Sequence, residues 1–474
     1  MAQTISADIC VIGGGSGGLS VAAGASQMGA RVVLVEHDRM GGDCLNFGCV
    51  PSKALIAAAH AAAAVRGAVR FGVNAAAPVV DHAAVRDHVR GVIAAIAPHD
   101  SVERYEGLGV QVIRASARFT GPTTVAAGDA VVTAKRVVIA TGSSPVAPPI
   151  PGIDTVPYLT NETVFDQAAA MDHLIVIGGG PIGMELAQAR RRLGARVTVL
   201  EMFAALGKDD PELAEVVKRR LAQEGVALHE GIEIRSVARD GDGVAVTIAR
   251  DGQETRVAGS HLLVAAGRAP NLDGLGLEAA GISFSRGGIK VDARLRTSNR
   301  KVFAIGDAAE GYRFTHIAGY HAGIVIRNVL FRLPARVDYR AVPWVTYTDP
   351  ELAQVGMGEA EARTAHGAIR ILRSPFAEND RARTERETDG LIKVIATKNG
   401  TVVGAGMVGP HAGEVIQLWC LAIQKKMKIK DVAGLILPYP TLGEINKRAA
   451  GSFYTPSLFS ERTRCLVRLL LRLG

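Results

Sequence analysis

DICVIGGGSGGLSVAAGASQMGARVVLVE, residues 8–36, is the stretch that decides the fold of this chain. An apolar run leads into a glycine-rich turn, a helical pattern follows, and a second apolar run ends in Glu36. Gly13 permits a tight turn, Gly15 lets a pyrophosphate approach the backbone, and Gly18 lets helix pack on strand. The stretch therefore predicts a strand–turn–helix–strand unit that binds a dinucleotide.

A second copy of this pattern occupies residues 173–201, HLIVIGGGPIGMELAQARRRLGARVTVLE. Its glycines Gly178, Gly180 and Gly183 and its closing acid Glu201 match the first copy in spacing. One glycine-rich turn is a weak signal, but two in the same context are a strong one. Phosphates sit at the helix N-terminus, and the closing acid accepts hydrogen bonds from ribose hydroxyls. The chain is therefore expected to bind two dinucleotides.

The acid of the second copy bears on the choice between NADH and NADPH. Glu201 would repel a 2′-phosphate, which favours NADH. Lys208 lies downstream and leaves NADPH open.

The composition is that of a globular chain of about three domains. Its 474 residues are 48% hydrophobic and 21% charged. The net charge of +8 comes from scattered basic residues, with small clusters at 190–192 and at the C-terminal end. No concentrated stripe indicates nucleic-acid binding. No signal peptide and no transmembrane run of about 18 apolar residues is evident, so we expect a cytoplasmic location.

Two of the five cysteines lie five residues apart in GGDCLNFGCVPSK, residues 41–53. Cys44 and Cys49 could be a metal clip, a structural disulfide or a redox pair. A zinc site needs about four ligands, and no second close Cys/His pair is evident. A stable disulfide is unexpected in a reducing cytosol, so any disulfide here would be one that cycles.

Two dinucleotide folds beside a cysteine pair resemble the class I pyridine nucleotide–disulfide oxidoreductases, which include dihydrolipoyl dehydrogenase, glutathione reductase and mercuric reductase. The resemblance covers nearly the whole chain. ATGSSP (140–145) and AAGRAPN (265–271) are similar to the family's crossings between domains, and VFAIGDAA (302–309) is similar to its second flavin motif. The implied contacts are Thr141, Gly142 and Asp307 with FAD, and Gly267 with NAD(P).

The resemblance implies an α/β chain with two Rossmann-like domains and an α+β dimerisation domain. FAD would bind 1–150, NAD(P) would bind 151–271, and 272–340 would return to the FAD domain. The interface domain would span 341–474, opening with VPWVTYTDPELAQVG (342–356). The implied enzyme is a homodimer whose active sites are shared across subunits.

The resemblance also assigns roles around the cysteines. Cys49 is implied to be the flavin-facing thiol, and Cys44 the exposed thiol that meets substrate. Lys53 would stabilise reduced flavin, with Glu185 as its partner. Asp43 stands where threonine is common in the family, and its charge is expected to raise the pKa of Cys44.

Another departure lies in LPYPTLGE, residues 437–444. Dihydrolipoyl dehydrogenase and glutathione reductase carry a catalytic histidine where this chain has Tyr439, whereas Glu444 is retained. A phenol with a pKa of about 10 is a poor proton acceptor at neutral pH. Mercuric reductase also presents a tyrosine in this register, but this chain lacks that enzyme's C-terminal vicinal cysteines.

Three cysteines remain. Cys10 and Cys420 stand in apolar runs and are expected in the core. Cys465 lies in SERTRCLVRLLLRLG (460–474), which predicts a basic amphipathic helix. That helix could dock on the interface domain or contact a membrane surface.

The leading hypothesis is an NAD(P)H oxidoreductase. Electrons would pass through FAD to the Cys44–Cys49 disulfide and on to a small disulfide, a dithiol partner or a soft metal ion, as in mercuric reductase. One alternative is dihydrolipoyl dehydrogenase. Another is an NAD(P)H oxidase or a quinone or metal diaphorase that uses flavin directly, because Pro181 replaces the tyrosine that gates the family's nicotinamide pocket. A non-catalytic assembly subunit fits the intact motifs least.

Overall fold

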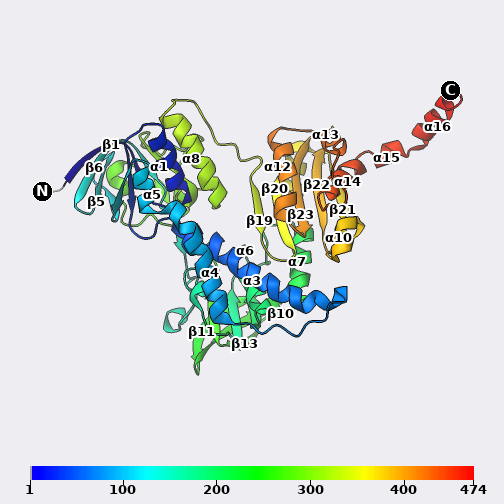
Figure 1. Cartoon of the computed structure of the whole chain (residues 1–474), viewed down its shortest axis with the longest axis horizontal. Coiled ribbons are helices and arrows are strands. Elements are labelled where there is room, and N and C mark those ends of the chain that lie inside the picture. The colour runs from blue at the N-terminus through cyan, green and yellow to red at the C-terminus, as the bar shows by residue number, and fades with distance from the viewer. Residues whose placement is uncertain (1–2, 474) are drawn as a thin grey trace. The chain divides into compact units, whose positions relative to one another are not determined.

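The computed structural model describes residues 3–473 and divides into two compact units, whose elements Figure 1 labels. Unit 1 contains the described residues up to Gly179, together with Ala189–Met202 and Gly231–Val337. Unit 2 contains Gly180–Gln188, Phe203–Glu230 and the described residues from Asp338 onward. Each unit is treated by itself below.

The first sheet of unit 1 has the strand order β3-β2-β1-β6-β5-β4, and β18 also pairs with β6. Strands β1, β2, β3, β6 and β18 run parallel, whereas β4 and β5 are antiparallel additions. The strands are β1 (Gln3–Ile12), β2 (Val32–Glu36), β3 (Val110–Arg114), β4 (Ala117–Phe119), β5 (Thr124–Ala127), β6 (Ala130–Ile139) and β18 (Val302–Ala304). A parallel core of this kind is the dinucleotide-binding arrangement that residues 8–36 predict.

Both faces of β1 are buried, with the alternation of side chains that a strand imposes. Ile9 and Val11 pack with the helices α1 (Ser16–Gln27) and α8 (Thr315–Val329). Cys10 and Ile12 point to the opposite face and pack against the antiparallel strands. Cys10 is fully buried, and burial raises its thiol pKa to about 12, so the prediction of an inert core cysteine is confirmed.

The redox sequence forms two consecutive helices in unit 1, α2 (Gly42–Asn46) and α3 (Cys49–Gly67), followed by η1 (Ala68–Phe71). The run Gly42–Phe71 is the one helical segment within 3–473 that is long and apolar enough to cross a membrane. Seven side chains of α3 are buried in the protein, which accounts for this apolar character as packing. The neighbouring helices are α4 (His82–Ile96), η2 (Ala97–Asp100) and α5 (Val102–Gly107).

A second parallel arrangement in unit 1 contains β9 (Arg196–Leu200), β8 (His173–Ile177) and β14 (His261–Val264) in adjacent positions. It repeats the order of elements of the first copy, with α6 (Pro181–Arg192) following β8 in the chain. An antiparallel meander packs with it through a shared apolar core. The meander consists of β11 (Glu233–Asp240), β12 (Gly243–Arg250) and β13 (Gln253–Gly259).

Unit 2 is built on a five-stranded antiparallel sheet with the order β19-β20-β23-β22-β21. The strands are β19 (Pro343–Thr346), β20 (Glu351–Gly356), β21 (Ile369–Pro375), β22 (Leu391–Thr397) and β23 (Val402–Gly409). Helices pack against it, with Trp419 at the centre of the core. The indole Nε1–H donates to Asn446 at 2.7 Å, so the one polar atom of this buried ring is satisfied. Together with the two parallel arrangements, this sheet confirms the predicted fold class.

The helices of unit 2 connect and cover these strands. They are α7 (Pro211–Gln223), which precedes β10 (Val226–His229), and α9 (Glu359–His366), α10 (Asp380–Glu385), α11 (Ala412–Val415), α12 (Gln417–Gln424), α13 (Ile429–Ala433) and α14 (Glu444–Ser452). Cys420 lies on α12, half-buried against the core of the unit. Its Sγ–H donates to the Ile416 carbonyl, and burial raises its pKa to about 11.

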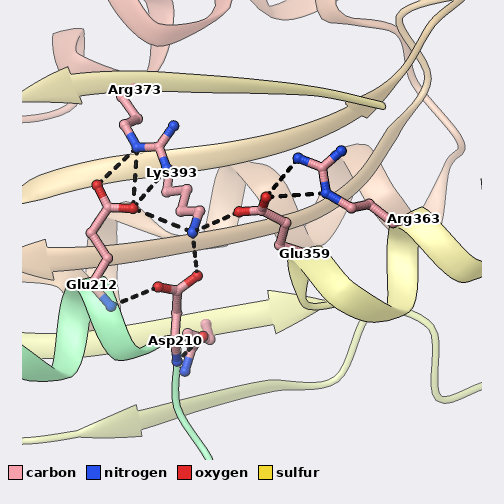
Figure 2. Close-up of polar contacts among 7 residues, drawn as sticks. Asp210, Glu212, Glu359, Arg363, Arg373 and Lys393 are labelled. Carbon is pink, nitrogen blue, oxygen red and sulfur yellow. Dashed lines mark hydrogen bonds and ion pairs between the residues drawn. The ribbon is translucent and has the colours of Figure 1, made fainter. Parts of the chain in front are cut away.

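An ion network ties α7 and α9 to the sheet within unit 2 (Figure 2). Lys393, on β22, has a buried side chain whose Nζ lies 2.7 Å from Asp210, 3.1 Å from Glu359 and 3.3 Å from Glu212. Burial opposes the charge on Lys393, but these three carboxylates outweigh it and raise the lysine pKa. Two partly exposed arginines also form ion pairs with these carboxylates. Arg373 pairs with Glu212, and Arg363 pairs with Glu359.

The chain ends in two helices, α15 (Thr455–Leu458) and α16 (Glu461–Leu470), at the C-terminal end marked in Figure 1. The predicted helix over the terminal segment is present. None of the residues of α16 is buried, so the expected docking on the interface domain is not seen within the single chain. Cys465 is exposed on this helix, with Sγ 3.7 Å from Glu461.

Candidate active site

The two glycine turns have the same geometry. Gly13 and Gly178 adopt positive φ angles of 107° and 111°, which suit glycine. A Cβ on either residue would overlap a backbone carbonyl, that of Ala140 at Gly13 and that of Ala265 at Gly178. The backbone packing in both turns therefore requires the first glycine of the motif.

The second glycine of each motif faces free space instead. A Cβ on Gly15 would meet only Gly42 Cα, at 3.8 Å, and one on Gly180 would meet nothing within 4 Å. Gly15 caps α1, which has no side-chain cap and no acid in its first turn. An open, uncapped helix N-terminus fits a pyrophosphate. In the first copy the third glycine, Gly18, packs directly on the Gly13 carbonyl.

The closing acids are fixed by matching hydrogen bonds. Glu36 Oε2 accepts from the Gly14 N–H at 2.5 Å, and Glu201 Oε2 accepts from the Gly179 N–H at 2.7 Å. Each bond holds a carboxylate beside its glycine turn and leaves acceptor sites for ribose hydroxyls. The third glycine of the second copy, Gly183, lies in the first turn of α6.

The two crossing motifs meet as a ribbon in unit 1. Strand β7 (Ser143–Pro145) pairs antiparallel with β15 (Arg268–Pro270). Thr141 Oγ1 donates to the Asn271 carbonyl at 2.8 Å, and the Asn271 side chain returns a bond to the Thr141 carbonyl at 3.0 Å. The Asn271 N–H donates to Gly142, and the Gly267 carbonyl accepts from the Val146 N–H. The crossings are therefore adjacent in space, as the resemblance implied.

A series of polar contacts connects this ribbon to the second flavin motif (302–309) and to helix α2. Ser143 Oγ donates to Asp307 at 2.6 Å, and Arg268 donates to both Ser143 oxygens. Arg268 also pairs with Asp43 at 2.9 Å. Burial raises the pKa of Asp307, against the opposing effects of Ser143 and of the Arg268 and Arg313 charges. Asp307, on η6 (Gly306–Ala308), is thereby fixed in place, and its contact with FAD stays a prediction.

The cysteines lie on two different helices that bring their thiols together. Cys44 is in α2, and Cys49 is the first residue of the 19-residue helix α3. Both are free thiols that hydrogen-bond to each other. Cys49 Sγ also lies 3.5 Å from Thr315 Oγ1, at the start of α8. Cys49 is exposed and Cys44 half-buried in the protein chain, whereas the resemblance implied that Cys44 is exposed.

The two thiol pKa values move in opposite directions. The hydrogen bond from Cys44 is the main cause that lowers the pKa of Cys49 to about 6, opposed by burial and assisted by Thr315 and the Lys53 charge. The pKa of Cys44 is raised, first by this same interaction and then by burial. A helix N-terminus also favours a thiolate. The two thiols therefore titrate as a pair in which Cys49 is the more acidic member.

The role expected of Asp43 needs a correction. Cys44 has the raised pKa that was predicted, but Cys49 and burial are the principal causes. The Asp43 charge instead slightly raises the pKa of Cys49. Its carboxylate is paired with Arg268 and accepts from Asn161 at 3.1 Å, which limits its effect on either thiol.

The remaining predicted residues fall in both units. Lys53 lies on α3 of unit 1, one turn after Cys49. Glu185 is buried on α6 and accepts from the Tyr347 N–H at 2.9 Å within unit 2. Tyr439 is 71% exposed and donates to Asp380 at 3.1 Å, and Glu444 accepts from the Thr441 N–H. Pairing of Lys53 with Glu185 stays a prediction.

Sequence reasoning missed the residues that support the thiols from a distance. Thr315 is 266 positions from Cys49, and nothing in its local sequence marks it. Arg268 forms an ion pair with Asp43, and Asn161 donates a hydrogen bond to it. The sequence motif that contains Arg268 was identified, but its contact with Asp43 was not. Within residues 3–473 no group of three or more His, Cys, Asp or Glu side chains could hold a metal ion.

Two open dinucleotide turns and a dithiol with one activated member define a dinucleotide-dependent dithiol oxidoreductase. Residues 7–322 match the model of the pyridine nucleotide-disulphide oxidoreductase family, and residues 342–450 match the dimerisation domain of that family. The chain belongs to the pyridine nucleotide-disulphide oxidoreductases. It is thus a flavoprotein oxidoreductase that uses FAD and NAD(P) and carries a dimerisation domain.

Known proteins of two activities resemble it about equally. A mercuric reductase of Streptomyces lividans is 37% identical over 458 residues, covering 94% of this chain and 96% of the relative. A dihydrolipoyl dehydrogenase of Geobacillus stearothermophilus is 36% identical over 465 residues, with the same coverage.

Two solved structures share the fold. LpdA from Mycobacterium tuberculosis has a TM-score of 0.86 at 29% identity, covering 95% of this chain and 99% of that one. The Cu(II) complex of the HOCl-induced flavoprotein disulfide reductase RclA from Escherichia coli has a TM-score of 0.84 at 26% identity. It covers 93% of this chain and 98% of that one.

Proposed function

We propose that the protein is a cytoplasmic, homodimeric, NADH-preferring reductase of a soft metal ion or a small disulfide, similar to mercuric reductase. The observation that carries this proposal is the Cys44–Cys49 pair, in which one thiol is activated and the other keeps its proton. A thiolate is both the nucleophile of disulfide exchange and a ligand of soft metals. The preference for NADH rests on Glu201 beside the second glycine turn.

Bound FAD supplies the transfer of two electrons between the nicotinamide and the disulfide. The residues that would hold it are Gly13, Gly15, Glu36 and Asp307, through the open turn and the fixed carboxylates. NADH would bind at the turn of Gly178–Gly180.

The dithiol then carries out the second half-reaction. In exchange with a disulfide, the Cys44 sulfur bonds to one substrate sulfur and the other leaves as a thiol with a proton. Cys49 next attacks the Cys44 sulfur, which closes the protein disulfide and releases the second substrate thiol. With Hg(II), both sulfurs would bind the metal and two electrons would pass to it as the disulfide forms; with Cu(II), the two electrons would pass to two ions, one each. Both routes oxidise the dithiol by two electrons.

The proton on Cys44 must leave before this sulfur attacks. Tyr439 is a poor acceptor for it, because the Asp380 carboxylate raises the phenol pKa above its usual value of about 10. The Cys49 thiolate already accepts the hydrogen bond from Cys44, so it is the nearest base within unit 1. A metal ion displaces the proton without a separate base, which favours a soft metal acceptor over lipoamide.

An anaerobic titration with NADH followed by a panel of acceptors tests the proposal. The panel contains Hg(II), Cu(II), glutathione disulfide, lipoamide, a quinone and oxygen. We expect a long-wavelength thiolate–flavin absorption on reduction, and faster turnover with a soft metal than with lipoamide. Cys44→Ser and Cys49→Ser variants should lose metal and disulfide turnover; full retention in both would refute the thiol relay.

One alternative has an observation in its favour. Pro181 begins α6 at the position of the family's gating tyrosine, and the side chain of Ile182 beside it is 40% exposed. Direct reduction of a quinone or of oxygen by flavin would follow from such an open site. That activity would be indifferent to alkylation of the thiols, whereas the proposed activity would be abolished by it.

A further inference from the structure

The terminal segment from Ser460 to Leu473 is an amphipathic helix with no residue of α16 buried by the rest of residues 3–473. Four leucines share one face at the spacing i, i+3, i+4 and i+7 that places side chains together on a helix. They are Leu466, Leu469, Leu470 and Leu473, which are 53%, 56%, 55% and 76% exposed. Residues 471–473 continue the turn of α16, since their N–H groups bond to carbonyls one turn earlier.

The opposite face carries a basic stripe. Arg464, Arg468 and Arg472 recur every four residues on this face, whereas Arg462 lies one turn before Leu466 on the leucine side. Glu461 is the only acid of the segment and pairs with Arg468 at 3.5 Å. With four arginines against one glutamate, the side chains of 460–473 carry a net charge of +3.

This segment lies outside the part of the chain that the family shares. The match to the dimerisation domain ends at residue 450, before α15 and α16 begin. Two copies of the segment packed face to face would bring two clusters of +3 together, which like-charge repulsion disfavours.

We propose that α16 binds the surface of an anionic lipid membrane. An amphipathic helix with leucines on one face and arginines on the other lies in the membrane interface, with its apolar face among the acyl chains. The attraction between the arginines and anionic headgroups acts over about 8 Å at physiological salt. The contact is peripheral and would hold the reductase at the membrane surface without a spanning segment.

Sedimentation of the FAD-loaded protein with vesicles tests this inference. Phosphatidylcholine vesicles with and without phosphatidylglycerol are compared at low and high salt. We expect binding to the anionic vesicles only, weakened by salt. Because a buried leucine contributes on the order of tenfold in affinity, a Leu466→Glu/Leu470→Glu variant should bind on the order of a hundredfold more weakly.

Matched variants separate the lipid contact from general effects. Leu333→Glu changes an equally exposed leucine in unit 1, 49% exposed, and should bind vesicles like the unaltered protein. Arg464→Gln/Arg468→Gln should lose the dependence on phosphatidylglycerol and on salt. The flavin absorption spectrum confirms that each variant is folded.

Three results would overturn the inference. The first is no binding of the unaltered protein to anionic vesicles, and the second is equal binding by the Leu466→Glu/Leu470→Glu variant. The third is a smaller molar mass for that variant in light scattering, which would show that α16 covers a second copy of the chain. None of these results bears on the proposed reductase activity, because the segment contains none of the proposed site residues.

Discussion

Cys49 owes its low pKa to three groups that reach it from different parts of the chain. Cys44 donates to it from α2, Thr315 lies beside it from α8, and Lys53 adds a positive charge from one turn along α3. The cysteine pair and Lys53 are close in sequence and were identified from it. Thr315 was not, because a contact between residues 266 apart is created by the fold alone.

Replacing Cys44 should raise the pKa of Cys49 by an amount that depends on whether residue 44 can still donate a hydrogen bond. We expect Cys44→Ala to raise the pKa of Cys49 from about 6 toward 9, and Cys44→Ser to raise it less, because the hydroxyl still donates. The midpoint is measured from thiolate absorbance during a pH titration of the reduced protein. A Cys465→Ser background removes the other exposed thiol.

The sign of the pH dependence follows from this lowered pKa. As the pH falls through about 6 the Cys49 thiolate is protonated, so alkylation of Cys49 should slow below that value. In the alanine variant the same loss should begin near pH 9. An identical midpoint in the Cys44→Ala and unaltered proteins would contradict the role of the Cys44 hydrogen bond.

Tyr439 offers a gain-of-function test. We expect Tyr439→His to raise lipoamide turnover by about 100-fold, because a base with a pKa near neutrality contributes 10²–10⁴-fold to proton transfer. Steady-state assays with lipoamide and NAD⁺ measure the change. Tyr439→Phe should leave lipoamide turnover unchanged; if it abolished turnover, the phenol itself would be the proton acceptor.

At the scale of elements, the two glycine turns were the most predictable features of the molecule. Gly13 and Gly178 need positive φ angles and close backbone packing, and both requirements leave a local signature in sequence. The network around Lys393 has no such signature. Its lysine lies on β22, while its carboxylates come from the starts of α7 and α9, so only the packed unit reveals it.

Lys393→Met should destabilise unit 2 by about 3 kcal/mol at neutral pH, because it leaves the largely buried Asp210 carboxylate without its cation. Both tryptophans of the chain, Trp344 and Trp419, lie in unit 2, so their fluorescence during urea unfolding reports on this unit. Lys430→Met, at an exposed lysine of α13, is the matched control and should change stability by less than about 0.5 kcal/mol.

The destabilisation should depend on pH in a defined direction. Arg373 and Lys393 lower the pKa of Glu212, and Arg363 and Lys393 lower that of Glu359. Lowered carboxyl pKa values stabilise the fold above the unfolded value of about 4.3, and this stabilisation is lost as the pH falls. The difference in the free energy of unfolding between the unaltered protein and Lys393→Met should therefore become smaller below about pH 4. A difference of constant size would argue against the network.

For the whole molecule, a shared active site requires the thiols of one subunit and the terminal motif of the other. Homodimers of Cys44→Ser and of Glu444→Ala should each be slow with the best acceptor of the panel. A dimer with one subunit of each kind should recover about half of the normal turnover, because one of its two sites is intact. Separately tagged subunits allow this dimer to be purified. No recovery would place each site within a single subunit.

The overall architecture followed from sequence because repeats and glycine turns are local patterns with fixed physical causes. The position of the terminal helix did not follow. Its heptad-like leucines predict an amphipathic helix equally well whether the apolar face is covered or exposed, and only the fold shows that α16 buries no residue. Periodicity establishes that a face exists, whereas packing decides what lies against it.

The exposed arginines of α16 have a consequence for proteolysis. Arg462, Arg464, Arg468 and Arg472 give a trypsin-like protease four successive cleavage sites on a helix with no buried side chain. One cut after Arg462 would remove the leucine face while leaving both nucleotide turns and the thiol pair intact. If α16 binds a lipid surface as proposed, such a cut would release the protein from that surface irreversibly without altering its active-site residues.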